Sequence, residues 1–228
     1  MYKIDRHDEQ KCLICDNSLD YGIDLQHFFT NRDVVCCNCR KMLVECRRIV
    51  VLADLRVKAL YKYNEFYQKL IIRYKEYGDE ALADVVVYPF TKKLHKQYQG
   101  YTVVGVPSSL SKLNQRGFSH VEKMFRLLDL KYREIFHKDE FSQKHQGYQT
   151  RQDIARHIFL KEEVPSGPLL LVDDLLTTGA SIKACYQLLK AKNDQVEVLV
   201  GAVSTRLLIG KRYLRQFGVE RRGNAGKS

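Results

Sequence analysis

The clearest hydrophobic pattern in the chain is the aliphatic run at residues 169–172, in which no polar position alternates with the apolar ones. Such a run predicts a buried parallel strand, and the Pro-Ser-Gly-Pro stretch before it is typical of a turn. From Ala180 to Leu189 apolar residues recur at helical spacing, which predicts an amphipathic helix. Strand, loop and helix form half of a βαβ unit, so we expect an α/β fold with its ligand site beyond the carboxyl ends of the strands.

Residues 101–122 repeat this pattern of strand, loop and helix. In residues 61–79 the spacing of Tyr67, Leu70, Ile71 and Tyr74 predicts the buried face of a helix. The tyrosines and basic residues of this segment also suit a stacking and phosphate-binding surface for single-stranded DNA, so both interpretations stay open. Residues 79–98 are ambiguous, because their alanines and leucines favour a helix while three successive valines and a proline oppose a smooth one.

The composition is that of a globular protein, with 228 residues, 45% hydrophobic and 29% charged. No apolar run approaches the length of a membrane span, and the charged N-terminal residues do not resemble a secretory signal. We therefore expect a cytoplasmic protein with no membrane span.

The net charge of +11 suggests a polyanionic partner, and its distribution says where that partner would bind. Residues 1–50 carry equal numbers of basic and acidic residues, so the whole surplus lies in residues 51–228. The chain from Arg206 onward is strongly basic. An acidic partner would therefore meet the main domain and its basic C-terminal tail.

Six of the seven cysteines precede residue 47, and four of them form two Cys-x-x-Cys pairs, Cys12 with Cys15 and Cys36 with Cys39. This spacing predicts a four-thiolate zinc site, which would be structural because it leaves no open coordination position. Cys37 or Cys46 could replace one of the four ligands, and four reduced cysteines without metal are a further alternative. Cys185 lies on an apolar helix face and is expected to be an inert core thiol.

The loop after residues 169–172 combines Asp173 and Asp174 with a hydroxyl-rich turn, whose residues are Thr177, Thr178, Gly179, Ala180 and Ser181. Hydroxyls, free amides and a helix N-terminus would hold a phosphate, and Gly179 permits close approach or a positive φ. Carboxylates beside a phosphate are tolerable if they bind a neutral diol attached to it, either directly or through a cation. The sequence therefore predicts a site for a ribose 5-phosphate.

Residues 169–181 resemble the signature of the type I phosphoribosyltransferase family, in which an apolar strand and two acidic residues precede Thr-Thr-Gly-x-Ser/Thr. The resemblance implies that Asp173 and Asp174 bind the ribose of phosphoribosyl pyrophosphate and that residues 177–181 bind its 5-phosphate. Ser108 and Ser109 would then form the pyrophosphate loop, and magnesium would accompany the ligand.

The wider chain is similar to the ComF family of competence proteins, because a four-cysteine finger, the element Val-Pro…Arg-Gly-Phe at 106–118 and the phosphoribosyl loop occur in that order. This resemblance favours a helix at 79–98. It implies a zinc-finger module at residues 1–48, a phosphoribosyltransferase-like domain at 49–228, and single-stranded DNA and a ComFA-like helicase as partners.

The chain departs from that family at Ser119 and His120, where Asn-Gln is usual, and at Lys112, where arginine is usual. Residues 137–157 occupy the place of the hood loop and keep Gln146 and Arg151. His120 and His157 are expected to be solvated or core residues rather than acid–base catalysts.

Two functions follow from these patterns. The first is a competence protein for natural transformation and DNA uptake, binding single-stranded DNA and carrying a phosphoribosyl pyrophosphate-type pocket. The second is an active phosphoribosyltransferase with an unidentified acceptor, and the patterns do not decide whether the chain is an enzyme. The candidate DNA contacts are Lys112, Arg116, Arg151, Arg212 and Arg215.

Overall fold

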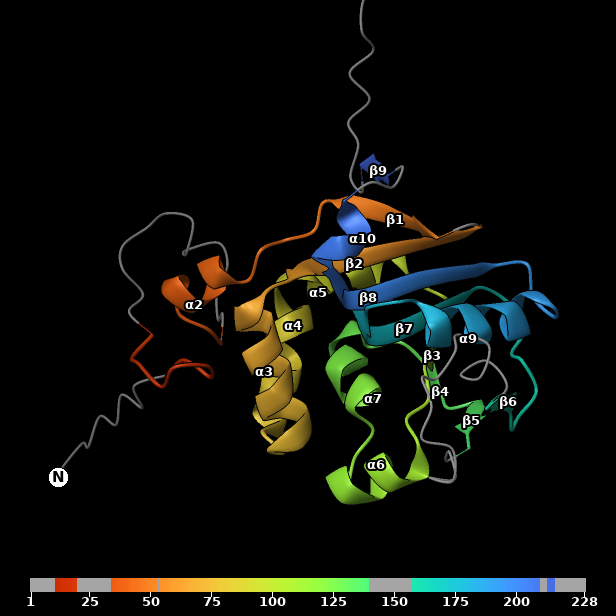
Figure 1. The fold of residues 1–228 in the computed structure, drawn as a ribbon, viewed down its shortest axis with the longest axis horizontal. Coiled ribbons are helices and arrows are strands. Elements are labelled where there is room, and N and C mark those ends of the chain that lie inside the picture. The colour runs from red at the N-terminus through yellow and green to blue at the C-terminus, as the bar shows by residue number, and fades with distance from the viewer. Residues whose placement is uncertain (1–10, 20–33, 53, 140–156, 210–212, 216–228) are drawn as a thin grey trace, which may run out of the picture.

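A mainly parallel sheet of seven strands forms the centre of the molecule (Figure 1). The structure is a computed structural model that describes residues 11–19, 34–52, 54–139, 157–209 and 213–215. The strand order is β4-β3-β7-β8-β2-β1-β9, parallel from β4 to β2 and antiparallel at β1 and β9. The strands are β1 (Arg48–Leu52), β2 (Leu55–Tyr63), β3 (Thr102–Gly105), β4 (Tyr132–Arg133), β7 (Leu169–Leu176), β8 (Val196–Ser204) and β9 (Tyr213–Arg215). The predicted α/β fold with a parallel sheet is confirmed.

Helices cover both faces of this sheet, as a parallel sheet requires. One buried cluster joins the sheet to α3 (Glu65–Glu76), α4 (Ala83–Val87), α5 (Thr91–Gln97) and α7 (His120–Phe125). A second cluster joins the opposite face to α9 (Ala180–Lys190). Side chains of β7 alternate between the two, with Leu170 in the first cluster and Leu171 in the second. Among the described residues no helix is long and apolar enough to cross a membrane.

Helix α3 forms as the pattern of residues 61–79 predicts. Asn64 precedes it in an extended conformation, and the side-chain oxygen of Asn64 accepts a hydrogen bond from the Tyr67 amide at 2.8 Å, which caps the first turn. The predicted core face is confirmed, because Tyr67, Leu70, Ile71 and Tyr74 are all buried.

Residues 79–98 are helical, as the family resemblance suggests, but they form a chain of short turns rather than one helix. Two 3-10 turns (Glu80–Leu82 and Tyr88–Phe90) alternate with α4 and α5, and Pro89 lies in the second turn. A proline cannot donate to a continuous helical ladder, so the break falls there.

Strand β7 does not end at residue 172, as the aliphatic run predicts, but continues through the two aspartates to Leu176. The extension is possible because the nine-residue β8 continues to pair with it, up to Leu176 opposite Val203. On its other side, β3 ends at Gly105 opposite Val172. The aspartates therefore lie beside an open position in the sheet, where the loop after β3 turns away.

The four-cysteine segment packs directly on the main domain. Its helix α2 (Cys37–Met42) lies beside α3 and α4 (Figure 1). Arg73 of α3 donates to the Ile14 carbonyl at 2.6 Å, and the Asn64 amide donates to the Met42 carbonyl at 2.9 Å. β1 begins at Arg48, the last residue of the predicted finger module, and the division into two domains stays a prediction.

A short helix and a small two-stranded sheet follow β3 and β4 along the chain. The loop after β3 leads into α6 (Leu110–Arg116), which ends at Gly117 with a φ of 79°. Strands β5 (Phe136–Lys138) and β6 (Ile158–Leu160) pair antiparallel at the base of the predicted hood. Gln146 and Arg151 of that hood lie outside the described residues, as do Arg212 and residues 216–228 of the tail.

Candidate functional site

The sheet and its loops bring most of the predicted ribose-phosphate residues into one pocket of about 370 Å³. It lies at the carboxyl ends of β3 and β7, the position expected for a ligand in a parallel α/β fold. Its lining residues are Lys75, Glu76, Val106, Pro107, Ser108, Ser109, Lys112, Arg116, His120, Lys138, Asp173, Asp174, Leu175, Thr177 and Ser181. A larger depression of about 470 Å³ lies near the amino ends of β2 and β8 and contains none of the motif residues.

Asp174 is the anchor of this pocket, although its side chain is almost completely buried. Its carboxylate accepts from Lys75 Nζ at 3.1 Å and from His120 Nε2 at 3.2 Å, and its main-chain carbonyl accepts from the Tyr67 hydroxyl. Burial alone would raise the pKa of Asp174, but the hydrogen bond from His120 and the charge of Lys75 hold it well below its usual range. Asp174 is therefore stabilised as an anion in the folded protein.

His120 is held in one neutral tautomer by its neighbours. The guanidinium of Arg116 approaches Nδ1 at 2.9 Å and can only donate, so Nδ1 accepts and Nε2 carries the proton that faces Asp174. Burial lowers the pKa of His120, and the charges of Lys75 and Arg116 act in the same direction against the effect of Asp174. The neutral imidazole thus offers one hydrogen-bond donor and one acceptor, as a side-chain amide would.

The side chains of Ser108, His120 and Asp174 form a row of contacts that resembles the Ser-His-Asp triad of hydrolases. Ser108 Oγ lies 3.4 Å from His120 Nδ1, and His120 Nε2 lies 3.2 Å from Asp174. Nδ1 accepts the shorter bond from Arg116, so its lone pair is occupied. His120 cannot serve as a base toward Ser108 in this arrangement. The prediction that His120 is a core residue rather than an acid–base catalyst agrees with its burial.

Asp173 is adjacent in sequence but differs in its chemistry. It is half-buried at the pocket wall, and its Oδ1 accepts from the Asp174 amide at 2.9 Å. Desolvation and the Asp174 carboxylate raise the pKa of Asp173. A hydroxyl donor or a cation entering the pocket would relieve this penalty.

The hydroxyl loop follows the predicted design. Thr177 and Ser181 line the pocket, while Thr178, Gly179 and Ala180 form the turn between them. The Ala180 amide donates to the Thr178 hydroxyl at 3.4 Å, and Gly179 has a φ of 79°. The positive φ favours glycine at this position, and a Cβ there would lie 2.7 Å from Leu52 Cδ1, so the leucine side chain would have to move.

Two lysines face the loops without a counter-ion. Lys112 of α6 and Lys138 of β5 form no salt bridge within the described part of the chain. Burial lowers the pKa of Lys138, and the charge of Lys112 adds to this effect. A pair of like charges that repel one another in this way is suited to bind an anion with several charges.

The structure places only some of the candidate DNA contacts. Lys112 and Arg116 line the pocket itself, and Arg116 is buried against the Lys75 carbonyl at 2.9 Å. The backbone of Arg215 pairs with Arg48 in the sheet. Arg151 and Arg212 lie outside the described residues.

Sequence analysis missed Lys75 and Lys138 as site residues. Lys75 lies four residues after Ile71 and eight after Tyr67, so it continues the buried stripe of α3. A cation in an apolar stripe indicates a buried anionic partner, and that pattern could have revealed it. No pattern distinguishes Lys138, which reaches the pocket only through the position of the β5–β6 hairpin.

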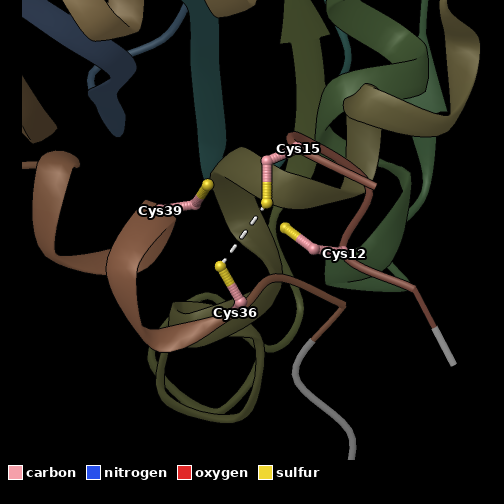
Figure 2. A group of neighbouring side chains, drawn as sticks. All are labelled: Cys12, Cys15, Cys36 and Cys39. Atoms are coloured by element: carbon pink, nitrogen blue, oxygen red, sulfur yellow. Dashed lines mark hydrogen bonds between the residues drawn. The ribbon is translucent and has the colours of Figure 1, made fainter. Parts of the chain in front are cut away.

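The four predicted metal ligands form a second site, outside the pocket. The sulfur atoms of Cys12, Cys15, Cys36 and Cys39 lie within 4.8 Å of one another and point toward a common centre (Figure 2). Cys12 and Cys15 flank a tight turn, in which the Asp16 amide donates to the Cys12 carbonyl at 2.9 Å. Burial opposes ionisation of Cys12, yet hydrogen bonds from the backbone near Cys36 and Cys15 lower its pKa to about 7.

This cluster fits a tetrahedral four-thiolate metal site. The alternative ligand Cys46 lies in a different core cluster, where its thiol faces the Arg48 carbonyl. Cys185 is fully buried, in accord with a core thiol.

His120, Asp173 and Asp174 also lie close enough to form a metal site. A metal on His120 Nε2 would displace the proton from that nitrogen, and Arg116 prevents the other nitrogen from taking it up. Lys75 already neutralises Asp174. This trio therefore does not fit a metal, although Asp173 alone remains open to one carried by a ligand.

The neutral state of His120 predicts a pH dependence of stability. The unfolded histidine binds a proton below a pH of about 6.5, whereas folded His120 does not until lower pH, so the free energy of unfolding falls as the pH decreases through this range. His120→Gln, which keeps a donor and an acceptor, should reduce this decline. Urea denaturation at pH 7.5 and pH 5 measures it, with His137→Gln, whose side chain is 38% exposed, as the control. An unchanged decline in His120→Gln would contradict the neutral state.

The sulfur cluster predicts a single bound zinc per chain. Cys39→Ser should lose the metal and lower the melting temperature, because the cysteine segment packs on α3. Cys37→Ser and Cys46→Ala should keep it. Metal content by mass spectrometry and thermal denaturation test this. Retention of zinc by Cys39→Ser together with its loss from Cys37→Ser would show a different ligand set.

Comparison with known proteins gives one similarity of sequence and several of structure. No protein-family model matches the chain. Competence protein ComFC of Streptococcus pneumoniae is 30% identical over 135 residues, which cover 58% of this chain and 61% of that protein. The chain thus matches less than two thirds of that relative's length.

Solved structures similar to this one include two phosphoribosyltransferases. The hypoxanthine enzyme of Staphylococcus aureus is 19% identical with a TM-score of 0.35, covering 53% of this chain and 62% of that one. The orotate enzyme of Aeropyrum pernix is 14% identical with a TM-score of 0.32, covering 75% and 93%. The similarity to ComFC confirms the resemblance to the ComF competence proteins over more than half of the chain.

Proposed function

We propose that this chain is a competence protein of natural transformation that binds a phosphoribosyl pyrophosphate-type ligand in the pocket and single-stranded DNA on its basic main domain. The observation that carries the ligand is the meeting of three elements in one pocket: the aspartate pair, the hydroxyl loop at Thr177 and Ser181, and the Ser108–Ser109 loop. Each element suits a different part of a phosphorylated ribose.

The division of labour within the pocket follows from the environments of its residues. The Asp174 carboxylate already accepts hydrogen bonds from Lys75 and His120. Asp173 accepts only from the Asp174 amide among the contacts of the described residues, so we assign the vicinal diol of the ribose to Asp173. The turn at 177–181 offers hydroxyls and the N-terminus of α9 to the 5-phosphate. Ser108, Ser109 and the two lysines without counter-ions would hold the pyrophosphate.

Magnesium is the cation that such a ligand would bring. Desolvation and the Asp174 carboxylate raise the pKa of Asp173 at the pocket wall, so its oxygens would fit an outer ligand to a cation bound by the pyrophosphate. When bound, the cation would neutralise part of the pyrophosphate charge. Zinc at the four cysteines would be structural and would hold the N-terminal segment on α3.

Phosphoribosyl transfer is the second candidate function, favoured by the presence of Lys112 and Lys138 in the same pocket as the aspartate pair. Cations at that position would stabilise a departing pyrophosphate, while Asp173 orients the ribose. Release of pyrophosphate in the presence of an acceptor would establish this activity.

The DNA and helicase contacts rest on the sequence relative and on charge. The relative is a competence protein, and the surplus of basic residues lies in residues 51–228. A ComFA-like helicase and a cytoplasmic location belong to this proposal through the same resemblance.

Asp173→Asn tests the ligand proposal. The amide keeps the size of the side chain but loses the charged acceptor, so affinity for magnesium phosphoribosyl pyrophosphate should fall by about 10- to 100-fold, the usual effect of one charge-assisted hydrogen bond. Isothermal titration calorimetry measures the affinity, and Asp194→Asn, whose side chain is 99% exposed, is the matched control. Equal affinity in all three proteins, or no binding to the wild type, would refute the pocket.

Fluorescence anisotropy with a labelled single-stranded oligonucleotide tests the DNA proposal. Because binding would release counter-ions, the affinity should decrease linearly with salt concentration on logarithmic axes. A series from low to physiological salt measures the slope, with a duplex of the same sequence for comparison. If no binding is detected at low salt, the DNA proposal is wrong while the ligand pocket is unaffected.

A further inference from the structure

A second depression of about 250 Å³ adjoins the ribose-phosphate pocket. The two share Lys75, Glu76, Lys112 and Arg116, and the second adds Tyr77, Gly78 and Gln115. The end of α3 and the end of α6 form its walls, and the Arg116 Nε bond to the Lys75 carbonyl holds them together at 2.9 Å. A ligand longer than a ribose phosphate would pass from one depression into the other.

Tyr77 distinguishes this second depression. It follows the last residue of α3, and 79% of the residue is exposed, although tyrosine is a large aromatic residue. The tyrosines of the same segment at positions 61, 67 and 74 are buried in the core. Core packing thus accounts for these three tyrosines but not for Tyr77, which borders the depression.

The charges between the two depressions favour a phosphate at the junction. Lys75 is engaged by Asp174. Arg116 is engaged by His120, by the Lys75 carbonyl and, at 3.9 Å, by the Glu76 carboxylate, which also lines both depressions. Lys112 lines both depressions and forms no salt bridge within the described part of the chain. It is therefore available to a phosphate that passes from one side to the other.

We propose that the second depression is a nucleobase subsite, in which a base stacks on Tyr77 while Lys112 contacts the adjoining phosphate and the Gln115 amide faces the edge of the base. This inference rests on the proposed ribose-phosphate pocket and names its ligand more closely. The ligand class is a nucleotide, either free or at the end of a single strand. Stacking on an exposed aromatic ring accepts any base, which suits a strand of arbitrary sequence.

The chain contains no tryptophan, so Tyr77→Trp would introduce a unique fluorophore into the subsite. Titration with thymidine monophosphate and with a twelve-residue thymidine oligonucleotide should quench its emission in a saturable way. Ile72→Trp is the matched control, because residue 72 is 40% exposed on the same helix and lines neither depression. Quenching by the oligonucleotide alone identifies a strand, and quenching by both identifies a nucleotide in general. Equal quenching at positions 72 and 77, or none at 77, would overturn the subsite.

Tyr77→Ala and Tyr77→Phe separate stacking from other effects. Loss of one stacked base should weaken nucleotide binding by about 5- to 150-fold in Tyr77→Ala, while Tyr77→Phe keeps nearly the wild-type affinity. Binding of phosphoribosyl pyrophosphate, which has no base, should be unchanged in both by calorimetry. If the wild type does not bind that ligand, the proposed pocket fails. If it binds, yet Tyr77→Ala binds nucleotides like the wild type, the subsite alone fails.

Discussion

The buried Asp174 carboxylate and its two partners are the constraint on which the pocket depends. A carboxylate that is 6% exposed is costly to bury unless it is paired, and here Lys75 comes from α3, His120 from α7 and the aspartate itself from β7. Satisfying that one charge fixes three elements relative to one another. Removal of a single partner would leave an uncompensated charge, so the positions of α3, α7 and β7 depend on one another. The position of Asp173 at the pocket wall follows from this fixed frame.

Helix α3 extends the same frame to the metal cluster. One end of the helix contacts the cysteine segment through Asn64, and Arg73 reaches the Ile14 carbonyl in the turn between Cys12 and Cys15. The other end supplies Lys75 to Asp174. A zinc ion that orders the cysteine segment would therefore also steady the helix that neutralises the pocket aspartate. The cysteine cluster lies outside the pocket, but α3 would link the binding of a metal there to the position of Lys75 in the pocket.

The sequence predicts residues that are close along the chain better than those brought together by packing. The cysteine pairs and the Asp-Asp to Ser181 motif are local, and the structure brings each of them together as expected. The end of β7 is mispredicted because its support comes from β8, which the aliphatic run of β7 does not reveal. Lys75 is separated from Asp174 by 99 residues, and only its place in a buried stripe indicates the contact. His120 stands where the resemblance to the ComF proteins leads one to expect a side-chain amide, and its neutral tautomer offers one donor and one acceptor, as an amide would.

Two adjacent aspartates with opposite pKa shifts show how environment, rather than residue type, assigns their roles. Asp174 is stabilised as an anion by groups of the protein, so a ligand gains little by binding it. Asp173 is destabilised as an anion by desolvation and by Asp174. A hydroxyl donor or a cation at this position would therefore form a favourable electrostatic interaction with the Asp173 carboxylate. Lys138 behaves in a similar way, because burial lowers its pKa and the charge of Lys112 acts in the same direction. The pocket thus combines the Asp173 carboxylate with Lys112 and Lys138, and the proposed phosphoribosyl ligand would offer hydroxyls to the first and phosphates to the lysines.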